Sequence, residues 1–376
     1  MTRVLLAPDK FKGTLTAEQV ATHVAAGLRG VLPDVDIVVV PVADGGDGTL
    51  AAALGAGFCR VPVRATGPTG MPVDTAYGVR GTDAVVELAE ISGLAQLPGG
   101  EPAALTATSR GTGELIAAAL DAGARRLVVG IGGSASTDGG AGLLEALGAR
   151  ILTATGEPVA PGGSALSYAA SLDLSGLHPA LADAEIVVAC DVDNPLTGQR
   201  GAPAVYGPQK GASPADVATL DAALAHWAEV VAATTGADHR DDAGAGAAGG
   251  VGFGLVSVAG ATMAPGAGLV FELTGLAAAM ADVDLVVTGE GSLDAQTLNG
   301  KAPAAVADLA RHLGVRVVAV AGRVLLSAAE IEAAGITRTY ALLDYASSAE
   351  EAMTAPGPLL ERIGARIAVD QLGGAS

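Results

Sequence analysis

Acidic side chains, lysines and glycines gather in six short loops along the chain. Five of these loops directly follow an apolar run that is typical of a β-strand: residues 8–13, 41–48, 130–136, 190–195 and 288–294. The sixth, residues 244–254, follows no clear strand. A turn that only joins a strand to a helix needs one glycine and one capping side chain. The loops carry more polar groups than that, so they are candidates for binding or catalysis.

The polar groups match the needs of phosphoryl transfer. That reaction requires a base for the attacking hydroxyl, cations near the γ-phosphate and carboxylates for Mg²⁺. Asp191 and Asp193 alternate along one loop and so point to the same side, and Lys10 and Lys12 supply cations. The further candidate carboxylates are Asp44, Asp47, Glu290 and Asp294. Each acid alone fits a helix cap equally well, and Mg²⁺ binds only one or two of them, but together they favour a site.

The loop Gly130-Ile-Gly-Gly-Ser-Ala135 matches the G-x-G-x-x-A pattern of dinucleotide sites and directly follows a strand. A nicotinamide site also needs an acid about 20 residues further on, where this chain has Ala149-Arg-Ile151. Hydroxyls on Ser134, Ser136 and Thr137 favour a loop that cradles phosphate. A nicotinamide-dependent hydroxy-acid oxidoreductase stays open as the weaker alternative.

Other catalytic signatures are missing from the sequence. No GxxxxGK[ST] occurs, and the pair at Gly300-Lys301 has the wrong spacing for a P-loop. The chain also lacks HRD, DFG, GxSxG and HExxH, and its five histidines form no cluster. Phosphoryl transfer would therefore use another scaffold.

Strands alternate with helices, which predicts an α/β fold with mostly parallel sheets. The expected strands are residues 3–7, 36–40, 126–130, 186–190, 284–288, 315–321 and 338–343, with a hairpin formed by 73–79 and 84–90. Thr16 and Gln19 form a capping-box pattern, and Ser213 caps a long helix over 214–234. Ligands of such sheets bind beyond the carboxyl ends of the strands, where the polar loops lie.

The composition of the chain excludes several classes of binding partner and site. The 376 residues suggest two domains, and the net charge of −19 with 3% aromatics argues against nucleic acid. Cys59 and Cys190 lie far from any metal-binding pattern and read as reduced cytosolic thiols. Residues 243–271 carry no charge but contain nine glycines, so we expect packed core and not a membrane helix. The sequence thus predicts a cytoplasmic protein without membrane contact.

Taken together, the loops resemble the bacterial glycerate kinases that make 2-phosphoglycerate. The resemblance rests on segments in family order over nearly the whole chain. They are Ala7-Pro-Asp-Lys-Phe-Lys-Gly13, Pro41-Val-Ala-Asp-Gly-Gly-Asp-Gly-Thr49, Gly130-Ile-Gly-Gly-Ser-Ala-Ser-Thr-Asp-Gly-Gly140, Ala189-Cys-Asp-Val-Asp-Asn-Pro-Leu196, Gly246-Ala-Ala-Gly-Gly250 and Thr288-Gly-Glu-Gly-Ser-Leu-Asp-Ala-Gln-Thr-Leu298 with Gly300-Lys301. Departures are Asp47 for Glu, Ser136-Thr137 for Thr-Asn, and Ser292 for Arg. If that arginine binds phosphate, Lys301 or Arg323 takes its place.

The resemblance implies two dissimilar α/β domains with an active-site cleft between them, and ATP, Mg²⁺ and D-glycerate as ligands. We expect residues 1–65 with 265–376 to form one Rossmann-like domain and residues 66–264 an inserted second domain. The 3-hydroxyl as phosphoryl acceptor and a non-catalytic organic-acid sensor stay open as alternatives, as do a monomer and a homodimer.

Because the acids, lysines and glycine loops all fall at predicted strand ends, we expect the following role for each candidate residue. Asp191 acts as base and Lys12 as the catalytic cation that holds the glycerate carboxylate. Substrate contacts come from Asp9, Lys10, Asp44 and Arg323. Nucleotide contacts come from Gly132, Gly133, Ser134, Ser136, Gly289, Gly291 and Lys301. The expected metal ligands are Asp193 and Glu290.

Overall fold

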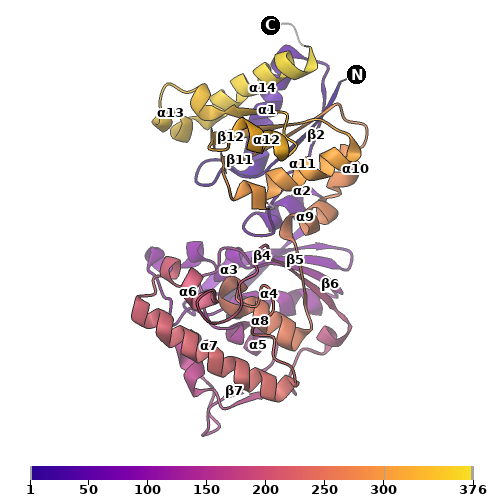
Figure 1. Ribbon diagram of the computed structural model, residues 1–376. Helices are drawn as coiled ribbons and strands as arrows, with labels where there is room; N and C mark the ends of the chain where they lie inside the picture. Colours follow the sequence, from indigo (N-terminus) through magenta and orange to yellow (C-terminus); the bar gives the residue numbers. More distant parts are fainter. Residues whose placement is uncertain (1, 300, 374–376) are drawn as a thin grey trace. The chain divides into compact units, whose positions relative to one another are not determined.

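The chain forms two compact units in the computed structural model, which describes residues 2–299 and 301–373 (Figure 1). The first unit contains the residues up to Asp44 and from Val270 onward, and the second is Gly45–Leu269. We expected residues 45–65 in the first domain. They belong to the second, because strand β3 (Cys59–Thr66) pairs with β4 (Pro72–Arg80) along its full length. Gly300 lies outside the described residues.

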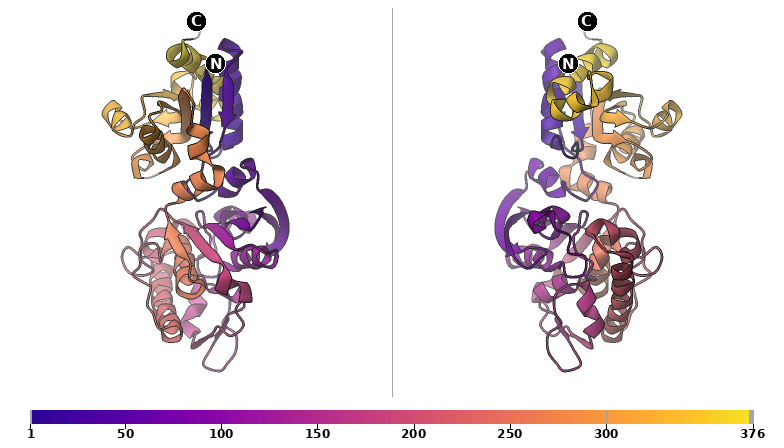
Figure 2. Two further views of the ribbon diagram at one scale, coloured as in Figure 1. Left: turned by 90° about the vertical axis from the view of Figure 1, so that its right-hand side faces the viewer. Right: turned by 90° about the vertical axis from the view of Figure 1, so that its left-hand side faces the viewer.

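The first unit is built on a five-stranded parallel sheet with the order β13-β12-β11-β1-β2. In chain order the strands are β1 (Arg3–Pro8), β2 (Asp36–Val39), β11 (Leu285–Leu293), β12 (Val317–Val324) and β13 (Arg338–Ala341). The two strands from the start of the chain lie side by side (Figure 2). In register, Leu6 is paired with Val39 on one side and Val287 on the other. All expected strands of this unit are therefore confirmed, with shifted ends.

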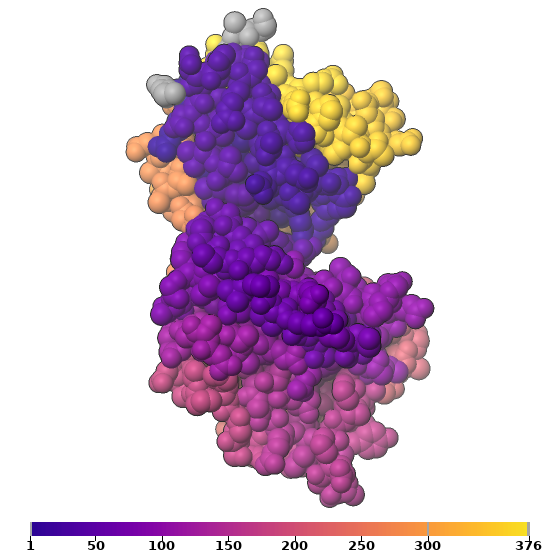
Figure 3. Space-filling model, turned by 180° about the vertical axis from the view of Figure 1, so that it is seen from behind, coloured from indigo at the N-terminus to yellow at the C-terminus, as the bar shows by residue number. Residues whose placement is uncertain are grey.

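Both faces of this sheet are buried. Along β1, Val4 and Leu6 join one hydrophobic cluster, while Leu5 and Ala7 join another, as the two-residue period of a strand requires. The first cluster includes residues of α1 (Ala17–Val31) and α14 (Pro356–Leu372), so indigo and yellow segments share one surface of this unit (Figure 3). The capping box of α1 is present as expected. The remaining elements are α9 (Gly266–Thr274), α10 (Leu276–Met280), η6 (Thr297–Asn299), α11 (Ala302–Leu313), α12 (Ala328–Ala333), η7 (Leu342–Asp344) and α13 (Ala349–Thr354); α9 begins in the second unit and ends in the first.

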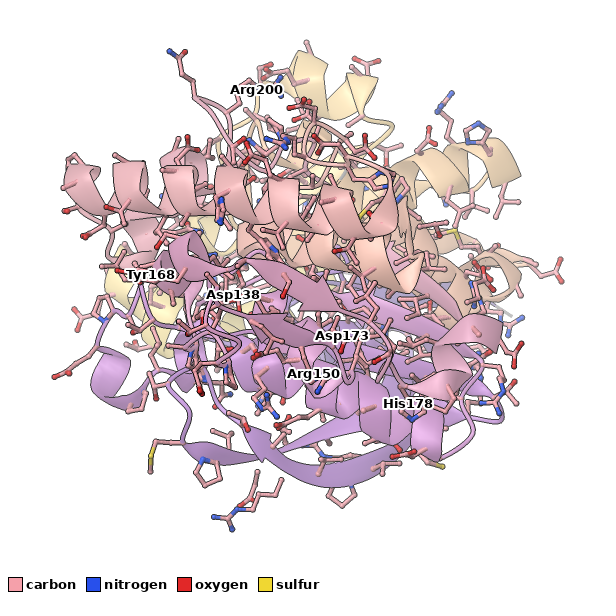
Figure 4. All side chains as sticks on the ribbon, turned by 90° about the horizontal axis from the view of Figure 1, so that it is seen from below. Asp138, Arg150, Tyr168, Asp173, His178 and Arg200 are labelled. Carbon is pink, nitrogen blue, oxygen red and sulfur yellow. The ribbon has the colours of Figure 1, made fainter. Side chains whose placement is uncertain are left out.

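The second unit contains a six-stranded mixed sheet with the order β10-β9-β6-β5-β4-β3. Four of its strands run parallel: β5 (Asp83–Glu87), β6 (Arg126–Gly130), β9 (Glu185–Ala189) and β10 (Thr262–Ala264). Strands β4 and β5 form the expected hairpin. A separate hairpin joins β7 (Arg150–Leu152) to β8 (Ser171–Asp173), with Arg150 paired to Asp173 (Figure 4).

Helices complete the second unit around one large hydrophobic cluster. The longest, α7 (Pro214–Thr235), starts after Ser213 as expected and buries Trp227, whose Nε1 donates to the Gly139 carbonyl oxygen at 3.1 Å. The other helices are α2 (Thr49–Gly55), α3 (Ala89–Ser92), α4 (Arg110–Asp121), α5 (Ala141–Ala146), α6 (Ala202–Tyr206), α8 (Ala247–Ala259), η1 (Leu94–Gln96), η2 (Pro98–Gly100), η3 (Gly163–Tyr168), η4 (Pro179–Asp183) and η5 (Pro208–Lys210).

The charge-free segment 243–271 is packed core, as expected. Helix α8 within it is 13 residues long and largely buried. Its residues Ala248, Gly249 and Gly250 have left-handed backbone conformations, so its first turn is irregular. Within the described part of the chain, no helix has the length and apolar character needed to span a bilayer.

Candidate functional site

Glycine loops of the second unit meet beyond the carboxyl ends of its parallel strands. Gly45 has φ +83°, and a Cβ there would lie 2.4 Å from Gly266 Cα and 2.8 Å from Ala189 Cβ. A Cβ on Gly132 would lie 2.7 Å from Gly46 Cα. No side chain fits at such distances, so the backbones of the loops after β6 and β10 approach the 45–48 loop closely, and the Ala189 side chain at the end of β9 also packs against Gly45. This is the edge at which ligands of open α/β sheets bind.

Asp191 lies on this edge, directly after β9. Its Oδ1 accepts a hydrogen bond from the backbone N–H of Gly266, the first residue of α9, at 2.8 Å. That bond fixes the orientation of an otherwise exposed carboxylate. A carboxylate held in this way can orient a hydroxyl group and accept its proton.

Asp193, the expected metal ligand two residues later, has different surroundings. Its side chain is 74% exposed, and both carboxylate oxygens accept from Nη2 of Arg200, at 2.8 and 2.9 Å. Arg200 projects from this unit (Figure 4). Asp193 would have to release Arg200 before it could bind a metal ion.

The loop after β6 combines an exposed turn with buried hydroxyls. Gly133 is exposed with φ +72°, and Gly132 is half-buried. Ser134 is only 6% exposed, and Ser136 is fully buried. Within the described residues, the hydroxyls of Ser136 and Thr137 have no hydrogen-bond partner. In this conformation Gly132, Gly133 and Ser134 can meet a phosphate, whereas Ser136 cannot.

A buried carboxylate supports the far end of the same loop. Asp138 Oδ2 accepts from the backbone N–H and the hydroxyl of Ser109 at 2.8 and 2.9 Å, and Oδ1 accepts from Gly140 N–H at 3.2 Å. Burial raises the pKa of Asp138, while these bonds lower it. Asp138 lies in the interior (Figure 4) and ties the loop to the start of α4.

Glu87 is a second supporting acid, and the sequence analysis missed it. At 1% exposure, its two carboxylate oxygens accept from the backbone N–H groups of Gly48 and Leu50, each at 2.8 Å. The pKa of Glu87 is raised to about 7, mainly by burial and also by its negative neighbours, against the lowering effect of the two bonds. The signal was an acid at the end of a valine-rich strand, which we placed inside a strand running to residue 90.

Three carboxylates gather toward the carboxyl ends of three neighbouring strands of the first unit, β11, β1 and the edge strand β2. They are Asp9 after β1, Asp44 after β2 and Glu290 within β11. The pKa of Asp9 is raised to about 7, mainly by burial and also by repulsion from Asp44 and Glu290. The backbone N–H of Lys10 donates to Asp9 Oδ1 at 2.6 Å, and this bond lowers the pKa of Asp9. The three acids therefore repel one another, and a bound cation would relieve that repulsion.

Glu290 is the most buried of the three, at 7% exposure. Its Oε1 accepts from Thr297 Oγ1 at 2.5 Å. Burial raises the pKa of Glu290, while Thr297 and the Lys301 ammonium lower it. Lys301 precedes α11 directly, which brings a cation to this acid.

The other residues expected in the first unit lie on β11 and β12 or, for Lys12, in the loop after β1. Arg323, opposite Ser292 in the register of β11 and β12, donates from Nε to Ser292 Oγ at 3.1 Å. A Cβ on Gly289 would lie 2.2 Å from the Val320 carbonyl oxygen, so that glycine serves sheet packing. A Cβ on Gly291 would lie 3.6 Å from the backbone nitrogen of Lys12, whose side chain is exposed.

The structure thus divides the expected site residues between the units. The first unit holds Asp9, Lys10, Lys12, Asp44, Gly289, Glu290, Gly291, Lys301 and Arg323, and the second holds Gly132, Gly133, Ser134, Ser136, Asp191 and Asp193. Among the described residues, no three His, Cys, Asp or Glu side chains are arranged to hold a metal ion. A metal here would need oxygen ligands from elsewhere, as Mg²⁺ commonly takes from phosphates.

A sequence model of the glycerate kinase family matches residues 4–371. The chain belongs to the glycerate kinase family. It is 42% identical to the glycerate kinase of Bacillus subtilis (strain 168), over 97% of each chain. It is also 42% identical to the glycerate 2-kinase of Escherichia coli (strain K12), over 93% of each chain.

Solved structures agree with the family assignment. The crystal structure assigned to glycerate kinase 2 of Salmonella typhimurium LT2 superposes with a TM-score of 0.86 at 41% identity. The superposition covers 99% of this chain and 98% of the Salmonella chain. Membership of the glycerate kinase family makes this protein an enzyme and favours phosphoryl transfer over the nicotinamide-dependent alternative.

Proposed function

We propose that this protein transfers the γ-phosphoryl group of ATP to the 2-hydroxyl of D-glycerate. The observation that carries the proposal is the full-length similarity to glycerate kinases, one of them named as a 2-kinase. Four of the polar segments that bear this similarity follow the carboxyl ends of β1, β2, β6 and β9, whereas residues 288–293, expected as a loop, belong to β11 and residues 247–250 belong to α8. The 3-hydroxyl is the alternative acceptor.

In the reaction, the 2-hydroxyl oxygen forms a bond to the γ-phosphorus as the bond to the β,γ-bridging oxygen breaks. The products are 2-phosphoglycerate and ADP. The hydroxyl proton passes to the carboxylate of Asp191 and then to solvent. The hydrogen bond from Gly266 N–H holds Asp191 in one orientation, which favours proton transfer because a base must lie within hydrogen-bond reach of its proton.

Substrate and nucleotide would be held by different groups. Lys12 binds the glycerate carboxylate, with Lys10 and Arg323 adding positive charge, and Asp9 and Asp44 accept hydrogen bonds from its hydroxyls. The backbone of Gly132 and Gly133 with Ser134 binds ATP phosphates. Lys301 and Gly291 supply further nucleotide contacts. Ser136 would join only after the loop rearranges, because its hydroxyl is fully buried.

Mg²⁺ fits the acids of the first unit. Carboxylate oxygens are the ligands that Mg²⁺ prefers, and Asp9, Asp44 and Glu290 repel one another. Glu290 would hold the ion on the protein side, and Asp193 is the other candidate once it releases Arg200. When bound, Mg²⁺ neutralises charge on the phosphates.

The test is an assay of the purified protein with ATP, Mg²⁺ and D-glycerate, in which ADP release is followed and the product isomer is assigned by phosphorus NMR. We expect 2-phosphoglycerate. A 3-phosphoglycerate signal would contradict the position of transfer alone, and ADP release that does not depend on D-glycerate would contradict the kinase. NAD(H) and NADP(H) serve as controls, because stabilisation by either against heat would support the oxidoreductase.

A further inference from the structure

Lys210 is a buried lysine whose ammonium reaches the loop after β6. It is the last residue of η5 and is 1% exposed. Its Nζ donates to Ser134 Oγ at 2.8 Å and to the Ser136 carbonyl oxygen at 2.5 Å. Burying an ammonium group is costly even when hydrogen bonds compensate it. The contacts therefore indicate that Lys210 serves this loop.

The loop has few other anchors. The backbone N–H of Leu94 donates to the Gly133 carbonyl oxygen, and that of Ala135 donates to the Ser92 carbonyl oxygen, both at 2.9 Å. Lys210 supplies the bonds to Ser134 and Ser136. Between these anchors, the tip of the loop at Gly133 stays exposed. The loop is thus fixed on its flanks and open at its tip.

The bond from Lys210 decides how Ser134 acts. A serine hydroxyl has one donor and two acceptor positions. Because lysine only donates, Ser134 Oγ accepts from Nζ, and its own hydrogen is left to donate to another group. Ser134 is 6% exposed and directly follows Gly133 in the chain, so a group bound at the tip of the loop would lie close to this hydroxyl.

The charge of Lys210 is incompletely balanced. Burial lowers the pKa of Lys210 to about 7, and attraction by the buried carboxylate of Asp138 opposes that shift. Asp138 is itself engaged by Ser109 and by backbone N–H groups of Gly140 and Gly142. An anion bound at the tip of the loop would favour the protonated, charged form of Lys210 behind Ser134.

Two unpaired hydroxyls next to this charge support the same picture. Ser136 Oγ and Thr137 Oγ1 are buried, and neither has a hydrogen-bond partner within the described residues. Buried polar atoms almost always have partners in native proteins. Two adjacent exceptions mark a stretch of the loop whose polar groups the polypeptide does not satisfy, although both side chains are fully buried in this conformation.

We infer that Lys210 is a positioning residue for nucleotide phosphate, which holds Ser134 so that its hydroxyl donates to a phosphate oxygen at Gly132 and Gly133. The inference deepens the proposed function and rests on it, because the phosphate is that of ATP. Lys210 acts through Ser134 and needs no contact with the nucleotide.

A double-mutant cycle tests this inference. The full-length wild type, Ser134→Ala, Lys210→Met and the double variant are titrated with ATP and Mg²⁺ by calorimetry, and Tm is recorded for each. We expect each single variant to raise the Kd for ATP about tenfold, since each loses a hydrogen bond involving a charged group. The double variant should bind ATP no more weakly than the weaker single variant, because both changes remove one interaction.

Ser167→Ala is the matched control. Ser167 is exposed in the same unit and donates to the Ser164 carbonyl oxygen at 2.9 Å. This variant should bind ATP as the wild type does. The KM for D-glycerate should stay unchanged in all variants that bind ATP, a separation that general loss of structure would not produce.

Three results would overturn the inference. Lys210→Met with lower Tm and unchanged Kd for ATP would show a structural role only. Independent, multiplying effects of the two changes would show that Lys210 does not act through Ser134. If Lys210→Met does not fold, Ser134→Ala decides, and an unchanged Kd in that variant rejects the inference. A wild type that binds no ATP would instead reject the proposed function, and this inference with it.

Discussion

Asp191 Oδ1 accepts the backbone N–H of Gly266 at 2.8 Å. The bond joins the end of β9 to the first residue of α9, and both belong to the second unit. The Ala189 side chain and the Gly266 backbone both approach Gly45, so Asp191 projects from a closely packed part of the sheet edge. Close packing around Asp191 suits a catalytic carboxylate, because its position relative to the substrate must stay fixed.

Replacing Asp191 with Asn should lower kcat by about 10²- to 10⁴-fold, the usual contribution of a general base. Asn can still accept from Gly266 N–H, so Tm should change little. Asp221→Asn is the matched control, because Asp221 Oδ1 also accepts a backbone N–H at 2.8 Å, from Gly198. Steady-state kinetics decide the matter, and near-normal turnover of Asp191→Asn would end its assignment as the base.

Glu290→Gln should raise the Mg²⁺ concentration for half-maximal activity by at least about tenfold, since loss of even a supporting group costs a metal site that much. The Gln side chain can still accept from Thr297, which limits damage to the fold. Glu332→Gln, an exposed change on α12 of the same unit, is the control. An Mg²⁺ titration at saturating ATP and glycerate measures the shift, and equal curves for both variants would speak against Glu290 as a ligand.

Glu87 should make the second unit less stable as pH rises. Its folded pKa of about 7 lies above the unfolded value, so the folded state holds the extra proton between about pH 4 and about pH 7. Its stabilising contribution is therefore complete at low pH and is lost as pH rises through that window. Glu87→Gln removes this dependence.

The measurement is urea unfolding of both proteins at several pH values. The difference in free energy of unfolding, Glu87→Gln minus wild type, should increase by up to about 3 kcal/mol between about pH 5 and about pH 8. A difference that does not vary with pH would show that Glu87 titrates normally.

Gly45→Ala should destabilise the second unit by more than left-handed strain alone. Alanine at positive φ costs about 1–2 kcal/mol, and its Cβ would also strike Gly266 Cα at 2.4 Å. Gly57→Ala has the same strain, at φ +90°, but nothing lies within 4 Å of its Cβ. Thermal unfolding of the two variants separates the cost of left-handed strain from the cost of the steric clash. Equal losses of stability would mean that the loops can move apart without cost.

Local patterns predicted most of the elements. Arg126–Gly130 is the strand expected from its apolar run, and Ser213 caps α7 as its type and spacing indicate. Strand β3 was not expected, and it contains Pro62. Proline is tolerated at a sheet edge, and β3 is the edge strand. Missing this strand also displaced the expected domain boundary.

The supporting residues of the site were harder to predict than the loops themselves. Lys210 follows Gly207-Pro-Gln209 and precedes Gly211, a composition typical of an exposed turn. Its burial depends on packing with the loop after β6, a segment more than 70 residues earlier in the chain. Glycine and acid patterns mark where a ligand can bind, whereas the side chains that hold such loops depend on tertiary contacts that no local pattern contains.

The order of the segments has a consequence for biosynthesis. Strand β1 pairs with β11, and Ala7 and Thr288, which share a hydrogen bond, lie 281 residues apart. At ribosomal rates of about 5–20 residues per second, β1 waits tens of seconds for its partner. The intervening segment Gly45–Leu269 contains all its own strand pairings and can fold during that wait. The nascent chain thus carries a folded second unit while β1 still lacks β11 and needs protection by chaperones.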